Sequence, residues 1–384
     1  LDTHGFPLDL TRVIASEHGL SVDEDEARDK HKEIQAKSHA AKGPILPAEE
    51  IAALWFRVRE KAGATRFVGY DSDDGKGRVL AIFDGDKEVE EVEAPCDVRV
   101  VLDATPLYGE SGGQVGDSGE IWGSMGRMRV TTTEKPLPEL HVHVGKLLDG
   151  RLAVGDEVQA STAGKLRDET RRNHSATHLL HLCLREVVGD HVQQKGSLVG
   201  PERLRFDYSH FEPLSPDQIV AIESRVNALV LENASTETTV TPVDEAKRSG
   251  ATMLFGEKYA GSVRMVRVGA RSLELCGGTH VRRAGDIGLF KILSDGGIAS
   301  GVRRLEAVTG SHALAFVQSR ERVLRQLSST LRAGVDELPA RVEKLVRDNK
   351  DLERSVDALR MKAAVGSRDD VLAGPGPRRA VLAP

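Results

Sequence analysis

Nine residues, NHSATHLLH (173–181), place two histidines at a spacing that matters if the chain is helical there. They lie within a longer run, 166–187, that is dense in helix-forming residues and predicts a helix. His174 and His178 are four positions apart, so on a helix they share one face, with their Cβ atoms about 5–6 Å apart. Such a pair can bind one metal ion, although most pairs of this kind only pack or face solvent. The stretch therefore predicts a metal site only if further ligands lie elsewhere in the chain.

A second stretch, LCGGTH (275–280), offers those further ligands. Cys276 and His280 are four positions apart, and Gly277 and Gly278 permit a sharp turn that would point both ligands inward. Together with the helix pair, the set comprises three imidazoles and one thiolate, which suits zinc, and we expect one zinc ion per chain. Four protein ligands are typical of structural zinc, whereas catalytic zinc keeps one position open. The spacing leaves both alternatives standing.

Three other residues of the predicted helix are rivals for a role at this site. His181 lies one turn beyond the histidine pair and Cys183 is rotated off its face, so we interpret both as packing residues. Thr177 could line a pocket, but a helical threonine more often bonds to its own backbone, and we favour that interpretation.

Short β-rich runs separated by turn residues precede this helix: RFVGY, RVLAIF, EVEEVE, CDVRVVLDA, MRVTTT and LHVHVG. Their spacing predicts a small β-barrel over residues 61–165. After the helix come two strand-like runs, QKGSLVG and ERLRFDYS, a helical run that begins at SPDQIV, and further strands at 236–243 and 263–275. This alternation predicts a two-layer α+β core over residues 166–310 that would hold the zinc site. The fold class expected for the whole chain is therefore α+β and multidomain.

Helices are expected at both ends of the chain. Residues 1–60 are dense in helix formers and predict a helical N-terminal segment. In the predicted helical part 311–362, seven residues alternate spacings of four and three, as in a coiled-coil seam: Leu338, Val342, Leu345, Asn349, Leu352, Val356 and Leu359. That seam would pair either with the preceding helix (312–332), as a hairpin, or with a second copy, as a homodimer. Residues 363–384 read as a linker.

The composition is that of a multidomain globular protein. Its 384 residues exceed the size of a single core, and no run of about 18 apolar residues appears, so we expect no membrane association. Three distant cysteines make no disulfide framework and no signal peptide is evident, which favours a cytoplasmic location. The chain begins at Leu1, so we expect a piece of a longer polypeptide. Its net charge of −6 argues against a broad nucleic-acid-coating surface but permits local basic patches.

Two glycine-rich stretches, YGESGGQVGDSG (108–119) and SDGGIASGVRRLEAVTG (294–310), could cradle phosphates with their backbone amides. Neither matches the P-loop or dinucleotide fingerprint, and hairpin turns are the plainer interpretation. Gln194, in the run QQKGSLVG, could donate to an acyl group or simply occupy the edge of a sheet.

Taken together, several stretches resemble the successive motifs of the alanyl-tRNA synthetase family over about residues 1–310. In order they are LDTHGFPLDLT, YGESGGQVGDSG, NHSATHLLH, QKGSLV with LRFDYSH, MLFGEKY, LCGGTH and GGIASGVRRLEAVTG. The first has His4 where that family usually has tyrosine.

The resemblance implies a division of the chain into five parts. They are the end of the tRNA-recognition helices (1–60), the β-barrel (61–165), a zinc-binding editing domain (166–310), the helical part (311–362), and a linker to an absent C-terminal domain (363–384). The resemblance also implies that the class II aminoacylation domain, with its ATP and magnesium, is absent from this chain.

The resemblance implies that the zinc ligands are His174, His178, Cys276 and His280, and that Gln194 is the editing glutamine. We hypothesise that Gln194 and Thr279 supply polar contacts in catalysis. Phosphates of tRNA would be held by Arg303 and Arg304 or by the glycine loop of Gly296 and Gly297. The implied activity is hydrolysis of seryl- and glycyl-tRNA formed on alanine-specific tRNA, whose aminoacylated CCA end would be the partner.

Three other interpretations stay open. A free-standing alanyl editing protein would share the barrel and core, although residues 1–60 and the trailing helices argue against it. The threonyl-tRNA synthetase editing module has a related metal motif but lacks the stretch GGIASGVRRLEAVTG. A zinc-stapled tRNA-binding module without hydrolysis is the third.

Overall fold

The computed structural model describes residues 48–253 and 261–372. The described residues fall into two compact units. The first unit lies within Leu1–Ser111 and Val115–Gly164, and the second lies within Gly112–Gln114 and Lys165–Pro384. The predicted helical run at 23–40, most of the motif MLFGEKY and the last twelve residues of the predicted linker lie outside the described residues. The finer division into five parts stays a prediction.

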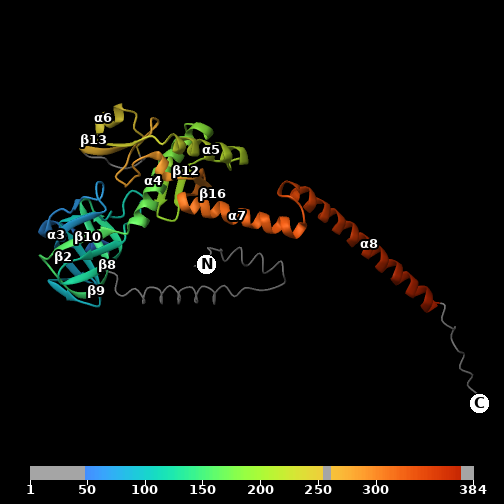
Figure 1. Ribbon diagram of the computed structural model, residues 1–384, viewed down its shortest axis with the longest axis horizontal. Coiled ribbons are helices and arrows are strands. Elements are labelled where there is room, and N and C mark those ends of the chain that lie inside the picture. The colour runs from blue at the N-terminus through green and yellow to red at the C-terminus, as the bar shows by residue number, and fades with distance from the viewer. Residues whose placement is uncertain (1–47, 254–260, 373–384) are drawn as a thin grey trace, which may run out of the picture. The chain divides into compact units, whose positions relative to one another are not determined.

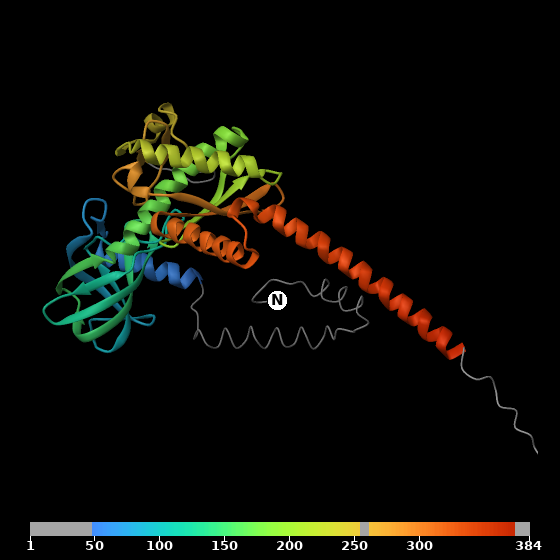
Figure 2. The ribbon, with the colours of Figure 1, turned by 45° about the vertical axis from the view of Figure 1, so that its right-hand side comes forward.

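The first unit contains the predicted barrel, which is confirmed (Figure 1). Its six strands pair in the closed order β10-β7-β8-β9-β5-β2, because β10 also pairs with β2. The strands are β2 (Asp74–Asp84), β5 (Cys96–Leu102), β7 (Gly119–Trp122), β8 (Gly126–Leu137), β9 (Leu140–Ala153) and β10 (Glu157–Thr162). Four short strands lie outside this ring: β1 (Arg66–Phe67), β3 (Lys87–Val89), β4 (Glu91–Glu93) and β6 (Ala104–Thr105). Figure 2 shows the strands of this unit curving round on themselves.

Alternation of apolar and polar residues explains the closure of the barrel. Along β5, Val98, Val100 and Leu102 are buried in one core with Met128 and Leu147 of neighbouring strands. Because successive strand residues face opposite sides, one face of each strand can fill the interior. The helix α3 (Ala48–Ala62) overlaps the end of the predicted N-terminal helical segment and runs two residues beyond it. It packs on this unit through Trp55 and Phe83, whose ring centroids are 5.3 Å apart.

The second unit has the predicted mixture of helices and antiparallel sheet. Its larger sheet has the order β11-β12-β17-β16, formed by β11 (Gln194–Val199), β12 (Leu204–Ser209), β17 (Val302–Thr309) and β16 (Phe290–Ala299). The smaller sheet is β13 (Thr236–Pro242), β14 (Ser262–Val268) and β15 (Ser272–Leu275). The helices are α4 (Gly164–Val188), α5 (Pro216–Glu232) and α6 (Val243–Arg248), with 3-10 turns at Ala284–Ile287 and Val335–Glu337.

Helix α4 is the central element of this unit. Its residues Leu180 and Leu184 are fully buried against Phe206 of β12 and Leu305 of β17 in one continuous core. The side chain of Asn173 ties the same helix to the sheet, because its Nδ2 donates to Gly200 O at 2.8 Å. Asn173 Oδ1 in turn accepts from Thr309 Oγ1 at 2.7 Å. Anchored in this way, the helix holds its other side chains in fixed positions.

Two further helices follow the sheet, α7 (Gly310–Leu331) and α8 (Leu338–Leu372). The predicted helix of the heptad seam is present, but its apolar seam is open in the single chain. Leu345, Leu352 and Leu359 have 45%, 64% and 65% of their surface exposed. Within the described residues only the start of the seam, at Leu338, is buried, the rest has no covering partner, and the homodimer alternative stays a prediction. None of the described helices is long and apolar enough to cross a membrane.

Candidate metal centre

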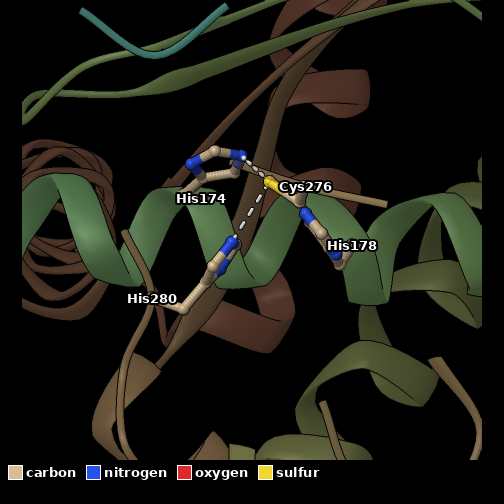
Figure 3. A group of neighbouring side chains, drawn as sticks. All are labelled: His174, His178, Cys276 and His280. Atoms are coloured by element: carbon tan, nitrogen blue, oxygen red, sulfur yellow. Dashed lines mark hydrogen bonds between the residues drawn. The ribbon is translucent and has the colours of Figure 1, made fainter. Parts of the chain in front are cut away.

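Four side chains predicted as ligands converge in the second unit (Figure 3). His174 and His178 come from α4, and Cys276 and His280 come from the loop that follows β15. One potential ligand atom from each lies within 4.8 Å of the others. The Sγ atom of Cys276 is 3.4 Å from His174 Nε2 and 3.3 Å from His280 Nε2. The structure thus brings two stretches about 100 residues apart in sequence into one cluster.

The loop that carries two of these residues is held by Arg264 of β14. Its guanidinium donates to the carbonyl oxygens of Cys276 and Gly278, both at 2.9 Å. In the reverse direction, the backbone N–H of Cys276 donates to Arg264 O at 3.0 Å. A charged donor on two loop carbonyls stabilises one loop conformation, so the thiol and the imidazole that the loop carries are fixed relative to each other.

Ser175 holds the ring of His280. Its Oγ lies 3.1 Å from His280 Nδ1 and accepts from the backbone N–H of Val281, also at 3.1 Å. A hydroxyl oxygen has two lone pairs, so it can accept from both groups. With Nδ1 turned toward Ser175, Nε2 of His280 faces Cys276.

A carboxylate lies beside the third imidazole. Oε2 of Glu274 is 3.4 Å from His178 Nδ1, an ion-pair distance without hydrogen-bond alignment. Its other oxygen, Oε1, is 2.9 Å from Nδ1 of His181. His181 is therefore linked to the centre through Glu274, in keeping with its interpretation as a packing residue. Cys183 is fully buried in the apolar core. The Thr177 hydroxyl donates to Asn173 O at 2.8 Å, as expected for a helical threonine.

The electrostatics of the cluster favour the protonation states of Cys276 and His280 that bind a metal ion. Burial alone would raise the pKa of the Cys276 thiol, but the imidazoles of His174 and His280 hold it well below its ordinary value. Burial, reinforced by the charge of His174, lowers the pKa of His280 to about 3. Burial opposes the charged form of His178 as well, yet Glu274 and Cys276 raise its pKa to about 9. A thiolate and a neutral imidazole are the forms that bind metals.

The geometry fits a tetrahedral metal ion. Bond lengths of about 2.0–2.1 Å to nitrogen and 2.3 Å to sulfur place tetrahedral ligand atoms about 3.6 Å apart. The observed sulfur–nitrogen distances of 3.3 and 3.4 Å are close to that value. The sulfur and two of the nitrogens therefore already have the spacing of ligand atoms, within a group whose ligand atoms all lie within 4.8 Å of one another.

The two residues predicted to act in catalysis, Gln194 and Thr279, lie on different elements of the second unit. Gln194 begins β11, and its Nε2 donates to Ser197 Oγ at 3.2 Å. Thr279 is 2% exposed, and its hydroxyl accepts from Gln114 Nε2 at 3.0 Å. Gln114, which our sequence analysis placed in a glycine-rich stretch without a role, also contacts His174 Nδ1 through Oε1 at 2.7 Å. No local sequence signal predicts this contact, because 60 residues separate its two partners.

The loop of Gln114 lies against strand β11. The backbone N–H of Val199 donates to Gly113 O at 2.7 Å, and a Cβ atom on Gly113 would lie 2.3 Å from Ser197 Oγ. Since Ser197 is also the partner of Gln194, the three residues Gly112–Gln114 link the strand of Gln194 to the metal cluster.

The predicted phosphate-binding residues lie on the hairpin of β16 and β17. Arg303 is 7% exposed, and its Nη2 donates to Asp295 Oδ2 at 2.6 Å. Arg304 donates to both carboxylate oxygens of Asp207, at 2.7 and 2.9 Å. Gly296 and Gly297 are exposed on β16, opposite Arg304 and Arg303 respectively. Both guanidinium groups are thus paired with a carboxylate.

Comparison with known proteins first defines a class. Residues 1–166 match the family described as tRNA synthetases class II (A). Residues 263–306, which include Cys276 and His280, match the family described as the threonyl and alanyl tRNA synthetase second additional domain.

More specific relatives are proteins named alanine--tRNA ligase. The chain is 45% identical to that of Parvibaculum lavamentivorans over 95% of its own length and 42% of the relative's. It is 48% identical to that of an Anaeromyxobacter species, over 97% and 41% of the two lengths. The chain is thus similar to alanine--tRNA ligases over nearly its whole length, and it spans about two fifths of the length of these relatives.

One expectation is corrected by these matches. The resemblance of the sequence implied that the class II aminoacylation part is absent from this chain, yet the class II family model matches residues 1–166. The expectation rested on the motifs that bind ATP and alanine, whereas the match extends over residues 1–166. The prediction that this class II part is lacking is therefore wrong.

Proposed function

We propose that this part of the protein binds one zinc ion and hydrolyses seryl- and glycyl-tRNA formed on alanine-specific tRNA. The observation that carries the proposal is the convergence of three imidazoles and one thiolate within 4.8 Å. The similarity to alanine--tRNA ligases and to the second additional domain supports the choice of substrate.

A limit of molecular recognition explains why such an activity is needed. A pocket that accepts alanine cannot strongly reject glycine, which lacks one methyl group, or serine, which adds one hydroxyl. A single group of this size contributes only about 1–3 kcal/mol to discrimination. A second site that removes the wrong amino acid after its attachment to tRNA supplies the remaining accuracy.

The residues His174, His178, Cys276 and His280 would hold the ion. When bound there, zinc would supply positive charge that favours negative charge on an ester oxygen. Because four protein ligands fill a tetrahedral ion, side chains of the protein must orient the ester and the attacking water. We assign this role to Gln194, whose half-buried amide can donate to the acyl group, with Thr279 as a second polar group within the ligand loop.

The grip on the CCA end requires groups that reach phosphates. We assign it to the hairpin of β16 and β17, where Gly296 and Gly297 expose their backbone. The side chain of Arg304 is 35% exposed while it contacts Asp207, whereas that of Arg303 is only 9% exposed. We therefore expect Arg304 to make the direct contact and Arg303 to shape the hairpin.

Hydrolysis of two substrates tests the proposal. Seryl-tRNA and alanyl-tRNA, both on alanine-specific tRNA, are incubated with the full chain, with and without added zinc. We expect rapid loss of serine but not of alanine, and loss of this activity in Cys276→Ala. No hydrolysis of seryl-tRNA by a folded, zinc-loaded chain would contradict the proposal.

A zinc-stapled tRNA-binding module is the second candidate, because four protein ligands are typical of structural zinc. In that case His178→Ala unfolds the second unit. Hydrolysis predicts instead that His178→Ala loses activity while circular dichroism and thermal melting still report a folded chain. A third candidate is a free-standing alanyl editing protein. The size of the native polypeptide, measured in a cell extract, would distinguish this candidate from the others.

Two proposals concern the whole protein. We propose that the polypeptide containing this chain attaches alanine to tRNA with ATP and magnesium, as the name of its relatives suggests. We also propose that two copies pair through the exposed seam of α8. Asn349 lies at an a position of this seam, and its Nδ2 donates to Glu353 Oε1 at 2.9 Å in the single chain.

A further inference from the structure

The side chain of Gln114 is fully buried beside the proposed metal site, although it lies 60 residues before the nearest ligand. Hydrogen bonds to His174 and Thr279 define its position. Its Oε1 is 2.7 Å from His174 Nδ1 and accepts from the backbone N–H of Thr279 at 2.8 Å. Its Nε2 donates to the hydroxyl of Thr279 at 3.0 Å. The amide therefore contacts one ligand on α4 and the residue that precedes another ligand, His280.

These contacts determine which end of the amide is oxygen. A backbone N–H can only donate, so the atom 2.8 Å from Thr279 N must be the acceptor, Oε1. The same oxygen faces Nδ1 of His174, and an oxygen of this kind cannot donate. Nδ1 of His174 must therefore carry a proton, and the other ring nitrogen, Nε2, faces Cys276 Sγ, 3.4 Å away.

From this we infer that Gln114 is a positioning residue of the metal centre, which fixes the tautomer and orientation of His174 and joins the helix ligands to the loop ligands. The inference rests on the metal site proposed above but not on the hydrolysis of any tRNA. Histidine ligands commonly donate their second ring N–H to an oxygen acceptor, and loss of that acceptor typically weakens metal binding 10–100-fold.

The surroundings explain why the loop can bring Gln114 so close. Gly112 and Gly113 have φ values of 59° and 83°, in the left-handed region that favours glycine. A Cβ atom on Gly278 would lie 2.8 Å from Oε1 of Gln114, so the ligand loop also needs a glycine where the amide approaches. Gly112 and Gly113 before Gln114, together with Gly278 in the ligand loop, therefore leave room for the amide between α4 and the ligand loop.

Three variants of the full chain separate the acceptor from other roles of the amide. Gln114→Leu removes the acceptor, and we expect zinc affinity, measured by competition with a chelator, to fall 10–100-fold. Gln114→Glu keeps an oxygen in the same place and should retain affinity within about threefold of the wild type, by the same reasoning. Thr279→Val keeps the backbone N–H that orients Oε1, so its loss should be smaller than that of Gln114→Leu.

The visible spectrum of the cobalt-substituted chain adds a readout of ligand geometry. We expect its bands to change in Gln114→Leu and to be restored in Gln114→Glu, while the exposed Gln318→Leu on α7 leaves spectrum and affinity unchanged. Wild-type affinity and spectrum in Gln114→Leu would overturn the inference. So would equal losses in the Leu and Glu variants, which would indicate a packing role. A wild-type chain that binds zinc tightly without hydrolysing seryl-tRNA would overturn the proposed function and leave this inference intact.

Discussion

Replacing Gly278 by alanine would place a methyl group where His174 already lies. The new Cβ atom would be 2.1 Å from Cε1 and 2.4 Å from Nδ1 of that ring, whereas ordinary contacts begin at 3.4 Å. The ring or the loop must therefore move by about 1.3 Å, the difference between an ordinary contact of 3.4 Å and the 2.1 Å found here. Metal–ligand distances tolerate only about 0.2 Å. The variant should therefore bind zinc at least 10–100-fold more weakly, as for loss of a supporting residue, and lose about 1–3 kcal/mol of stability.

The neighbouring glycine provides a matched control. A Cβ atom on Gly277 would have no atom within 4 Å, and neither glycine is among the described residues with positive φ. The backbone therefore accepts alanine at both positions, and only the space differs. Zinc affinity of both variants is measured by competition with a chelator, and stability by thermal unfolding with and without zinc. If Gly278→Ala bound zinc as tightly as Gly277→Ala, the geometry of the cluster described above would be wrong.

Three further predictions concern other parts of the chain. Burial lowers the pKa of His143 to about 4, below its unfolded value of 6.5, so protonation favours the unfolded state and stability falls as the pH drops from 6.5 toward 4. His143→Gln should remove about 2 kcal/mol of that loss of stability between pH 7 and pH 5. Urea unfolding, followed through the fluorescence of the two tryptophans, both of which lie in the first unit, measures this change. A pH dependence of stability that is unchanged in the variant would refute the prediction. Cys183→Ala should keep full zinc content and lose about 1–2 kcal/mol of stability, whereas Cys276→Ala should lose the metal; equal zinc contents would contradict this difference. Leu345→Glu with Leu352→Glu should shift sedimentation from dimer to monomer, and a wild-type chain that is already monomeric would exclude the seam as a dimer contact.

The ligand cluster could be predicted because its signals are local. His174 and His178 share a helix face by their spacing, and Cys276 and His280 share a short loop. The two halves meet because α4 and β15 belong to one unit, which a sequence pattern indicates only indirectly. Gln114 could not be predicted, since a single glutamine after two glycines carries no sign of the histidine that it contacts 60 residues later.

The structure gives one of the two loop glycines a role that the sequence did not indicate. The sequence suggested that Gly277 and Gly278 allow a sharp turn, but the structure assigns neither a left-handed conformation. Gly278 is needed because His174 lies against its Cα, and such a close approach leaves no trace in local sequence. Similarly, the heptad spacing predicted the helix α8 but could not name its partner, because an exposed apolar seam fits any complementary helix.

Zinc-edge X-ray absorption of the zinc-loaded chain, combined with its metal content, tests the central claim most directly. We predict one zinc ion per chain with one sulfur at about 2.3 Å and three nitrogens at about 2.0–2.1 Å. A first coordination shell without sulfur, or clearly less than one ion per chain after loading, would show that these four residues do not form the metal centre proposed here.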